Sequence, residues 1–489
     1  MPPPPIHRAQ LEQAAELLTE ILAAQSPADR LMERYFRLHR NMGARDRAFV
    51  AEAVYGVLHR RRQLDALLAA ARWAPPLPPQ IGPGGAASSA PPHPPQIGPG
   101  DEPGSALPPP PESGPGGEHA AAVQLHSSGG PGPERETGLG YVLAYVLAVG
   151  GWSAGALAQR GFPREEAALL PHVGAARDPA LPFAVRANLP DWLAGRLVAE
   201  LGEPEAAALA SALHQPATLD LRVNALRATR EAALEALLAA GFAAEPTPYS
   251  PVGLRARGRK PLQSLPAFRD GWFEVQDEGS QLVSLLLEPR RGQKLADFCA
   301  GAGGKSLHLA ALLENRGSVD AFDISKRRLQ GLRDRLRRAG LDNIRMRWIA
   351  SEEDPFLARY EGRMDGVLVD APCSGTGTIR RNPDILWRAI DLEALAAAQG
   401  RILAAAAKLV APGGRLVYAT CSLVREENEG VVESFLAAHE AFRLVPAGEV
   451  LARQGIALGD AVTKQGLLRL MPHRHHTDGF RAAVMQRES

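Results

Sequence analysis

The stretch that decides the fold is Lys294-Leu-Ala-Asp-Phe-Cys-Ala-Gly-Ala-Gly-Gly-Lys-Ser306. It begins as a short strand that ends near Phe298, and a glycine-rich loop follows at once. Gly301, Gly303 and Gly304 allow this loop to turn tightly and let its backbone approach a ligand closely. A strand followed by such a loop predicts a small-molecule site at the carboxyl end of the strand.

Two common nucleotide-binding patterns do not fit this loop. A phosphate loop would require glycine where the chain has Cys299, and the dinucleotide pattern would require glycine where it has Ser306. The next predicted strand ends near Asp323, where an acid often binds ribose hydroxyls. A glycine loop and a ribose acid without a phosphate cradle favour S-adenosylmethionine over ATP or NAD. The alternative is a purely structural turn between strand and helix.

Strand and helix patterns alternate from residue 276 onward, which predicts a doubly wound, Rossmann-like α/β domain with a mostly parallel sheet. Ligands of such sheets bind at the carboxyl ends of the strands, so the residues at those ends are expected to lie together. They are Asp297, Asp323, Asp370 and Cys421. The predicted elements are 294–298, 306–313, 318–322, 326–339, 343–349, 366–369, 395–409, 414–419 and 427–438.

The N-terminal part is predicted to be helical with one interruption. Apolar residues recur at helical spacing over 8–72, and the helical pattern resumes at 141–157. Residues 74–140 hold 18 Pro and 14 Gly, with the heptapeptide PPQIGPG at 78–84 and again at 94–100. Such a stretch cannot bury enough apolar area to offset its ordering entropy, which predicts a disordered insertion within one helical domain.

A small α+β unit is predicted after a second helical stretch at 181–201. Residues 218–224 alternate like a strand, and Thr229 is expected to cap a helix that ends near Ala240. Short strands are expected near 253–256 and 272–275. The unit resembles an RNA-binding module because it carries Arg222, Arg255, Arg257, Arg259 and Lys260.

Composition limits the remaining possibilities. A chain of 489 residues is expected to form two to four domains. Its three cysteines make neither a disulfide framework nor a CxxC zinc pair, so a reducing cytoplasm is expected. Neither a signal peptide nor a membrane span is expected. The net charge of +1 hides basic stretches at 30–62 and 325–347, which suit either a polyanion or solvated helix faces.

Two cysteines follow predicted strands of the α/β domain, which suggests covalent chemistry. Cys373 lies three residues after Asp370 and Cys421 follows the strand at 414–419. Methylation of a pyrimidine at carbon 5 needs a thiolate that adds at carbon 6, an acid beside the ring and a base for the carbon-5 proton. The residues supply two thiols, an acid and Lys305, but their chemistry does not say which thiol attacks. The alternative for each cysteine is inert packing.

The segments DFCAGAGGKS, DAPCSGTG, YATCS and Pro472-His-Arg-His-His-Thr-Asp-Gly-Phe480 resemble the Sun-domain family of RNA cytosine-C5 methyltransferases. The order and spacing of all four agree with the family, and the resemblance covers 276–489. Residues 275–281 look like the family's entry into the catalytic domain. Tyr55-Gly-Val-Leu-His-Arg60 and Leu64-Asp65 are similar to the NusB-like helical domain of bacterial members that act on small-subunit ribosomal RNA.

The resemblance implies roles for individual residues. Cys421 corresponds to the nucleophile and Cys373 to the thiol that helps release the product. Asp370 would contact the cytosine edge and Lys305 would reach the target base. The residues expected to bind the cofactor S-adenosylmethionine are Cys299, Ala300, Gly301, Gly303, Lys305, Asp323 and Asp370, with Cys299 a loop residue and not a catalyst. No metal is expected.

Two departures from the family pattern stand out. Members usually place an aspartate after the third strand to meet the adenine amine, and here Glu352, Glu353 and Asp354 are the candidates. The terminal motif usually continues Asp-Gly-Phe-Phe, whereas this chain has Arg481, for which a surface consequence is expected rather than lost activity.

The expected organisation is a NusB-like helical RNA-binding domain at 1–178 with its insertion at 74–140, a helical linker at 179–215, a small α+β RNA-binding module at 216–275 and a methyltransferase domain at 276–489. The expected function is methyl transfer to carbon 5 of a cytosine in 16S ribosomal RNA, naked or in an assembly intermediate, by a cytoplasmic monomer. The alternatives are transfer RNA as substrate, or a non-catalytic RNA-binding assembly factor.

Overall fold

The computed structural model describes residues 6–24, 26–72, 133–258 and 261–489. The heptapeptide repeats and most of the predicted insertion, together with Arg259 and Lys260, lie outside the described residues. One edge of the insertion was predicted wrongly, because helix α4 begins at Pro133 and residues 133–140 are therefore helical. Counting proline and glycine over a long window hides such a start, since the first position of a helix tolerates proline.

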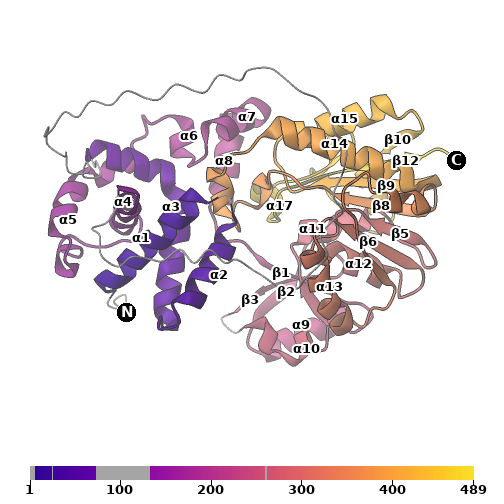
Figure 1. The fold of residues 1–489 in the computed structure, drawn as a ribbon, viewed down its shortest axis with the longest axis horizontal. Coiled ribbons are helices and arrows are strands. Elements are labelled where there is room, and N and C mark those ends of the chain that lie inside the picture. The colour runs from indigo at the N-terminus through magenta and orange to yellow at the C-terminus, as the bar shows by residue number, and fades with distance from the viewer. Residues whose placement is uncertain (1–5, 25, 73–132, 259–260) are drawn as a thin grey trace, which may run out of the picture.

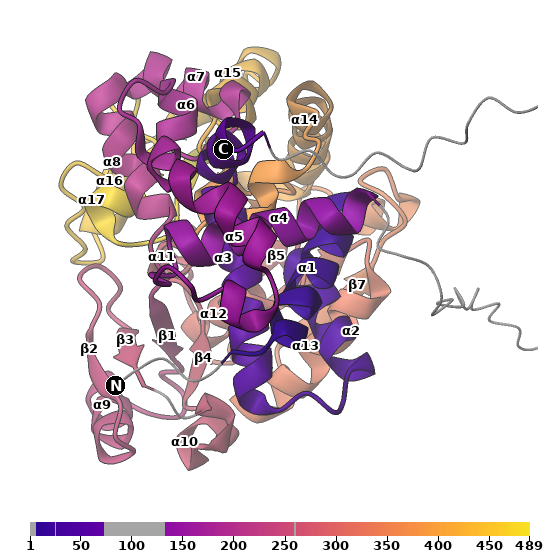
Figure 2. The same cartoon turned by 90° about the vertical axis from the view of Figure 1, so that its left-hand side faces the viewer.

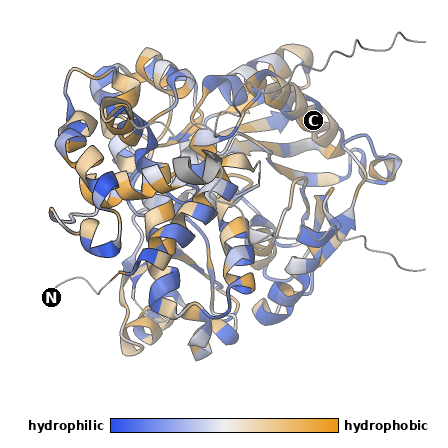
Figure 3. Cartoon of the chain, turned by 60° about the vertical axis from the view of Figure 1, so that its left-hand side comes forward, coloured by the Kyte–Doolittle hydropathy of each residue, from blue (hydrophilic) through white to orange (hydrophobic). Residues whose placement is uncertain are grey.

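The N-terminal part is a group of helices around an apolar core (Figure 1). Leu11, Leu18, Val54, Leu58 and Leu143 are fully buried in that core. Turned by 90°, the same helices lie in front of the remainder of the chain (Figure 2). Most carry hydrophilic and hydrophobic residues on the same helix, as amphipathic helices do (Figure 3). The helices around this core are α1 (Arg8–Ala23), α2 (Ala28–Leu38), α3 (Ala44–Ala70), α4 (Pro133–Ala148) and α5 (Pro163–Leu169). Three more helices contribute to a separate apolar cluster: α6 (Phe183–Arg186), α7 (Asp191–Leu201) and α8 (Glu203–Leu213).

A four-stranded antiparallel sheet follows, in the strand order β2-β3-β1-β4. As predicted, Thr229 caps helix α9, because its side chain accepts a hydrogen bond from the backbone N–H of Ala232. Strand β2 was not predicted; it is short and largely exposed, so its sequence has no apolar alternation. The elements are β1 (Leu219–Val223), α9 (Arg230–Ala239), β2 (Ala243–Pro246), β3 (Gly253–Arg257), α10 (Pro266–Arg269) and β4 (Phe273–Val275).

The C-terminal part is an α/β sheet in the order β10-β12-β9-β8-β5-β6-β7, with β11 paired to β12. Strands β5 to β9 are parallel, as predicted, and β10, β11 and β12 are antiparallel additions that were not predicted. The strands are β5 (Lys294–Asp297), β6 (Ser318–Asp323), β7 (Ile344–Trp348), β8 (Met364–Asp370), β9 (Val410–Thr420), β10 (Phe442–Val445), β11 (Leu468–Leu470) and β12 (Phe480–Arg487). The helices are α11 (Glu278–Leu285), α12 (Gly304–Leu312), α13 (Lys326–Ala339), α14 (Leu392–Leu409), α15 (Glu429–Ala438), α16 (Ala447–Ala452) and α17 (Pro472–His475).

Helices α7 and α8 pack directly on the loops that follow strands β8 and β9. Leu193 and Leu209 share one buried apolar cluster with Ile385, Leu423 and Val424. A second link runs from the indole N–H of Trp387 to the carbonyl of Leu58, at an N–O distance of 2.8 Å. The helical part therefore forms one wall around the residues that follow Cys421.

Two glycines join three of the sequence motifs through their backbones. The N–H of Gly377 donates to the carbonyl of Cys421 at 2.8 Å, and the N–H of Gly479 donates to the carbonyl of Gly377 at 2.9 Å. A Cβ at position 377 would lie 2.2 Å from the carbonyl oxygen of Gly479, which is closer than any side chain permits. Glycine is thus required at 377 by close backbone approach.

None of the described helices combines the length and apolarity needed to cross a membrane.

We expect Gly377→Ala to reduce the free energy of unfolding by about 1–3 kcal/mol, because the added methyl group must push two backbone segments apart. Thermal denaturation followed by circular dichroism measures this as a lower Tm. The matched control is Gly400→Ala in helix α14, where an added Cβ meets no atom within 4 Å. That change should leave the Tm equal or raise it, since alanine favours a helix over glycine by about 1 kcal/mol. Equal losses in the two variants would contradict the close-approach argument.

Candidate active site

A cavity of about 410 Å³ lies at the carboxyl ends of β5, β6 and β8. Its volume is in the range of sites for small ligands. Six of the seven predicted cofactor residues line it: Cys299, Ala300, Gly301, Lys305, Asp323 and Asp370. The seventh, Gly303, does not line the cavity, and its part in cofactor binding remains a prediction. Its φ is +81° and a Cβ there would lie 2.3 Å from Cδ1 of Leu332, so Gly303 turns the loop closely against helix α13.

One of the three acidic candidates for the adenine contact lies in the cavity wall. Glu352 lines the cavity and accepts a hydrogen bond from Nε of Arg401 at 3.0 Å. Asp354 instead caps the next helical turn by accepting from the backbone N–H groups of Ala350 and Phe356. Glu353 lies outside the cavity, beside Asp354. Of these three acidic residues, only Glu352 lies in the cavity wall, which the sequence alone could not decide.

The glycine loop is fixed to Asp323, the acid that ends strand β6. One carboxylate oxygen of Asp323 accepts from the N–H of Gly301 and the other from the N–H of Ser325, both at 2.7 Å. Each oxygen retains a second lone pair that can accept from a ligand hydroxyl. Asp323 thus shapes the loop and forms part of the cavity wall.

Asp297 is a wall residue that was not among the predicted site residues. One of its carboxylate oxygens accepts from Oγ of Ser306 at 2.6 Å, and the other, fully buried, has no hydrogen-bond partner among the described residues. Burial raises the pKa of Asp297 to about 7, and the nearby Asp370 carboxylate adds to this. Its position at the end of a predicted strand indicated a role in the site. The resemblance to the Sun-domain family assigned roles only to residues that follow it.

Lys305 and Asp370 form an ion pair at the edge of the same cavity, with Nζ and Oδ2 2.6 Å apart. Burial disfavours the charge of Lys305, but the adjacent Asp370, with Asp297 and Cys421, outweighs burial and raises the pKa of Lys305 above its ordinary value. The ammonium is therefore charged at neutral pH. It also lies 5.3 Å from the ring centre of Phe480 in the terminal motif.

The thiols of Cys373 and Cys421, each just after the end of a strand, lie next to each other. Sγ of Cys373, after β8, lies 3.4 Å from Sγ of Cys421, after the neighbouring parallel strand β9, and both are free thiols. The hydrogen bond to Cys421, together with burial, raises the pKa of Cys373 well above its ordinary value. Cys373 therefore stays protonated, and its thiol can donate to the sulfur of Cys421. Burial also raises the pKa of Cys299, which lies in the cavity wall.

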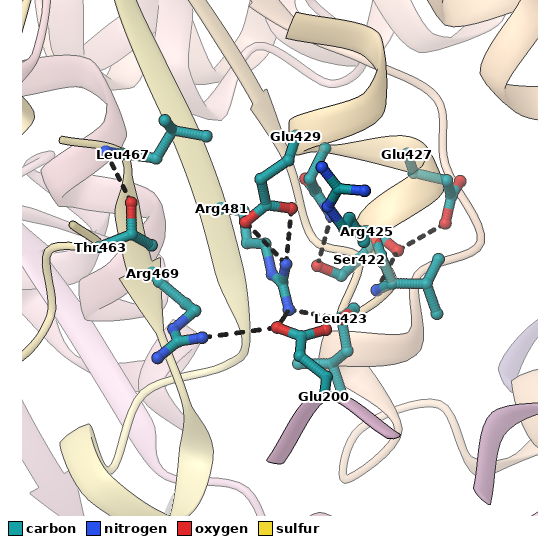
Figure 4. A network of polar contacts seen from close by, with 12 residues as sticks. Glu200, Ser422, Leu423, Arg425, Glu427, Glu429, Thr463, Leu467, Arg469 and Arg481 are labelled. Atoms are coloured by element: carbon teal, nitrogen blue, oxygen red, sulfur yellow. Dashed lines mark hydrogen bonds and ion pairs between the residues drawn. The ribbon is translucent and has the colours of Figure 1, made fainter. Parts of the chain in front are cut away.

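A single buried carboxylate, that of Glu427, holds both thiol loops. It accepts from the N–H of Ser374 at 2.8 Å and from the hydroxyls of Ser374 and Ser422 at 2.5 Å (Figure 4 shows the bond to Ser422). Gln399 donates to Glu427 and to the carbonyl of Pro372, each at 2.9 Å. Each cysteine is followed directly by a serine bound to Glu427. Sequence reasoning missed Glu427 and Gln399, because neither belongs to a motif segment.

The terminal motif is held beside the thiols by buried charges. Asp478 accepts from Nε of Arg380 at 2.5 Å and from Nε of Arg381 at 2.6 Å, and both guanidinium groups also contact Asp277. Arg481 follows this motif, and the expected surface consequence is wrong, since its side chain is buried and has four hydrogen bonds. No group of three metal-binding side chains occurs among the residues that the structure describes.

The chain is similar to known proteins. A family model described as 16S rRNA methyltransferase RsmB/F matches residues 284–486, and one described as the RsmF/B-like ferredoxin-like domain matches 189–263. A probable ribosomal RNA small subunit methyltransferase B from Synechocystis sp. is 36% identical over 303 residues, which are 61% of this chain and 67% of that relative.

Two solved structures are also similar. The protein PH0851 shares the fold along 99% of both chains, with a TM-score of 0.69 and 23% identity. NSun6 from Pyrococcus horikoshii, solved with SFG, is 25% identical with a TM-score of 0.54, over 61% of this chain and 98% of that one. With the paired thiols, the glycine-loop cavity and these matches together, the chain belongs to the RsmB/F family of 16S rRNA methyltransferases.

Proposed function

We propose that this protein transfers a methyl group from S-adenosylmethionine to carbon 5 of a cytosine in small-subunit ribosomal RNA, through a covalent bond between Cys421 and carbon 6. One observation carries the proposal. Two free thiols lie 3.4 Å apart, and the charged Lys305–Asp370 pair joins their site to a small-molecule cavity.

The cavity residues fit S-adenosylmethionine. Four carboxylates, those of Asp297, Asp323, Glu352 and Asp370, line a wall that a cationic ligand would complement. The unpartnered oxygen of Asp297 is a free acceptor in a buried position, which a ligand ammonium group would satisfy. Cys299, Ala300 and Gly301 offer backbone to the methionine end, Asp323 suits the ribose, and Glu352 suits the adenine amine. The relative NSun6, solved with SFG, supports a ligand in this fold.

S-adenosylmethionine would supply a methyl group made electrophilic by its sulfonium. The role of Cys421 is to form a sulfur–carbon bond at carbon 6 of the cytosine, which moves the electron pair of the ring double bond toward carbon 5. Asp370 and Lys305 would hold the ring edge and stabilise the charge that develops there. After carbon 5 has gained the methyl group, a base takes the proton from carbon 5. The electron pair of that C–H bond re-forms the ring double bond as the bond between carbon 6 and sulfur breaks, which returns the Cys421 thiolate.

The environment of the thiols supports the division of roles. Cys373 is held as a neutral thiol by its hydrogen bond to Cys421 and by burial, so it is poorly suited to attack a ring carbon. A neutral thiol at 3.4 Å can instead assist the departure of Cys421 after methyl transfer. The raised pKa of Cys373, together with the 3.4 Å separation, supports our assignment of Cys421 as nucleophile and Cys373 as the release thiol.

The RNA partner is proposed from the family and from charge. Matching relatives carry the name ribosomal RNA small subunit methyltransferase B. Helix α13 exposes Lys326, Arg327, Arg328, Arg333 and Arg337, a surface suited to phosphates.

We propose the organisation given above, with a NusB-like domain at 1–178, a linker at 179–215, an RNA-binding module at 216–275 and a catalytic domain at 276–489.

We expect Cys421→Ala to abolish methylation, because no sulfur then adds to carbon 6. Cys373→Ala should still form the covalent bond but release it slowly, so a protein–RNA adduct should accumulate. Denaturing gels with radiolabelled RNA and methyl donor measure both outcomes. The control is Cys299→Ala, which removes the third thiol and should form no lasting adduct. An adduct that accumulates in Cys421→Ala and not in Cys373→Ala would reverse the two roles.

We expect the affinity for S-adenosylmethionine to fall as the pH drops below about 7. Free Asp297 has a pKa of about 7, and a cationic ligand binds better to its ionised form. Each pH unit below 7 should then raise the Kd up to about tenfold, until the pKa in the complex is reached. Calorimetry at pH 5.5 and pH 7 tests this, with Asp297→Asn as the variant that should bind more weakly at pH 7 and lose the pH dependence. The same slope in Asp297→Asn would assign the titration to another group.

A further inference from the structure

Arg481 lies directly beside the nucleophile loop. It is the second residue of β12 (Phe480–Arg487), and in the antiparallel pairing of β12 with β9 it stands opposite Thr420, the residue before Cys421. Its side chain is only 4% exposed. A guanidinium so deeply buried is costly unless hydrogen-bonded partners surround it.

The guanidinium of Arg481 joins three separate segments (Figure 4). Nη1 donates to both carboxylate oxygens of Glu429, the first residue of α15, at 2.8 and 2.7 Å. Nη2 donates to Oε1 of Glu200 in helix α7 at 2.6 Å and to the carbonyl of Leu423 at 2.8 Å. One side chain thus connects the N-terminal helical part, helix α15 and the loop that carries Cys421.

The loop after Cys421 is held by hydrogen bonds to three different partners. The hydroxyl of Ser422 donates to Glu427, and the N–H of Leu423 donates to Oγ1 of Thr376 at 2.8 Å. Arg481 fixes the remaining polar group of Leu423, its carbonyl. The Leu423 side chain is buried in the apolar cluster that includes Leu193 and Leu197 of α7, so α7 contacts the loop both directly and through Arg481.

We propose that Arg481 is a positioning residue for Cys421, which makes the orientation of the nucleophile depend on the docking of helix α7. The proposal rests on the proposed function, since it assigns Arg481 to the step in which Cys421 attacks. Arg481 itself does not line the cavity, and its hydrogen bonds go to Glu429, Glu200 and Leu423. It acts through the carbonyl of Leu423, two residues from the sulfur.

A purely structural role for Arg481 would also stabilise the fold, so stability alone does not distinguish the two. A positioning role predicts a slower chemical step with unchanged binding of RNA. Arg469 provides a matched control, because it also pairs with Glu200, at 3.4 Å, whereas the carbonyl of Leu423 accepts its hydrogen bond from Arg481. Glu200→Gln tests the link to α7 separately.

The experiment compares Arg481→Met, Arg469→Met and Glu200→Gln in single-turnover methyl transfer to small-subunit ribosomal RNA, with enzyme and S-adenosylmethionine saturating. We expect Arg481→Met to slow the transfer at least tenfold while the Kd for RNA changes less than threefold. Glu200→Gln should slow it at least threefold, and Arg469→Met less than twofold. Equal rates in Arg481→Met and Arg469→Met, or a changed Kd with an unchanged rate, would overturn the proposal, and an unaffected Glu200→Gln would overturn the link to α7.

Arg481→Met leaves the partly buried carboxylate of Glu429 without its ion-pair partner, which can prevent folding. The double variant Arg481→Met/Glu429→Gln removes that charge and still lacks the contact to Leu423, so it should fold and remain at least tenfold slow. A folded double variant with the wild-type rate would also overturn the proposal.

A second readout needs no RNA. We expect the alkylation rate of Cys421 by iodoacetamide, measured by mass spectrometry of the Cys421 peptide, to change at least threefold in Arg481→Met and to stay within twofold in Arg469→Met. Equal alkylation rates in the two variants would count against positioning. If the wild-type protein neither methylates RNA nor forms an adduct, the proposed function fails instead, whatever the alkylation rates show.

Discussion

The site depends on one shared contact, the carboxylate of Glu427 that binds the serines after both cysteines. Glu427 is fully buried, and with Gln399 it ties the residues that follow β8 to those that follow β9. Parallel strand register brings the two thiols to the same edge of the sheet, but only a common partner fixes their sulfur atoms 3.4 Å apart. The proposed division into an attacking and a releasing thiol requires that distance.

Buried hydrogen bonds and ion pairs connect the loop after Cys373, the terminal motif and helix α7 around this contact. The backbones of Gly377 and Gly479 connect the loop after Cys373 to the terminal motif, and Asp478 holds that motif to Arg380 and Arg381. Arg481 then extends the connection to helix α7. The loop that carries Cys421 is therefore held partly by the N-terminal helices. These helices form one wall of the site although none of their residues lines the cavity.

Much of this could be predicted from the sequence, because local patterns fix it. The parallel strands, the cap at Thr229 and the strand-end positions of Asp323, Asp370 and the cysteines follow from apolar periodicity and spacing. Other features depend on distant partners. The burial of Arg481 arises from Glu200, which is 281 residues away, and Gly303 faces Leu332 rather than the cavity. Only the folded structure shows that Glu352, and neither of the two acidic residues after it, lies in the cavity wall.

The most direct test of the account is to locate the covalent bond itself. RNA that carries 5-fluorocytosine cannot lose a proton from carbon 5, so the enzyme should remain attached to it after methyl transfer. Tryptic cleavage places Cys421 in peptide 416–425 and Cys373 in peptide 364–380, which tandem mass spectrometry distinguishes. The account predicts that the nucleotide is attached to Cys421 in the first peptide, and attachment to Cys373, or no attachment at all, would contradict it.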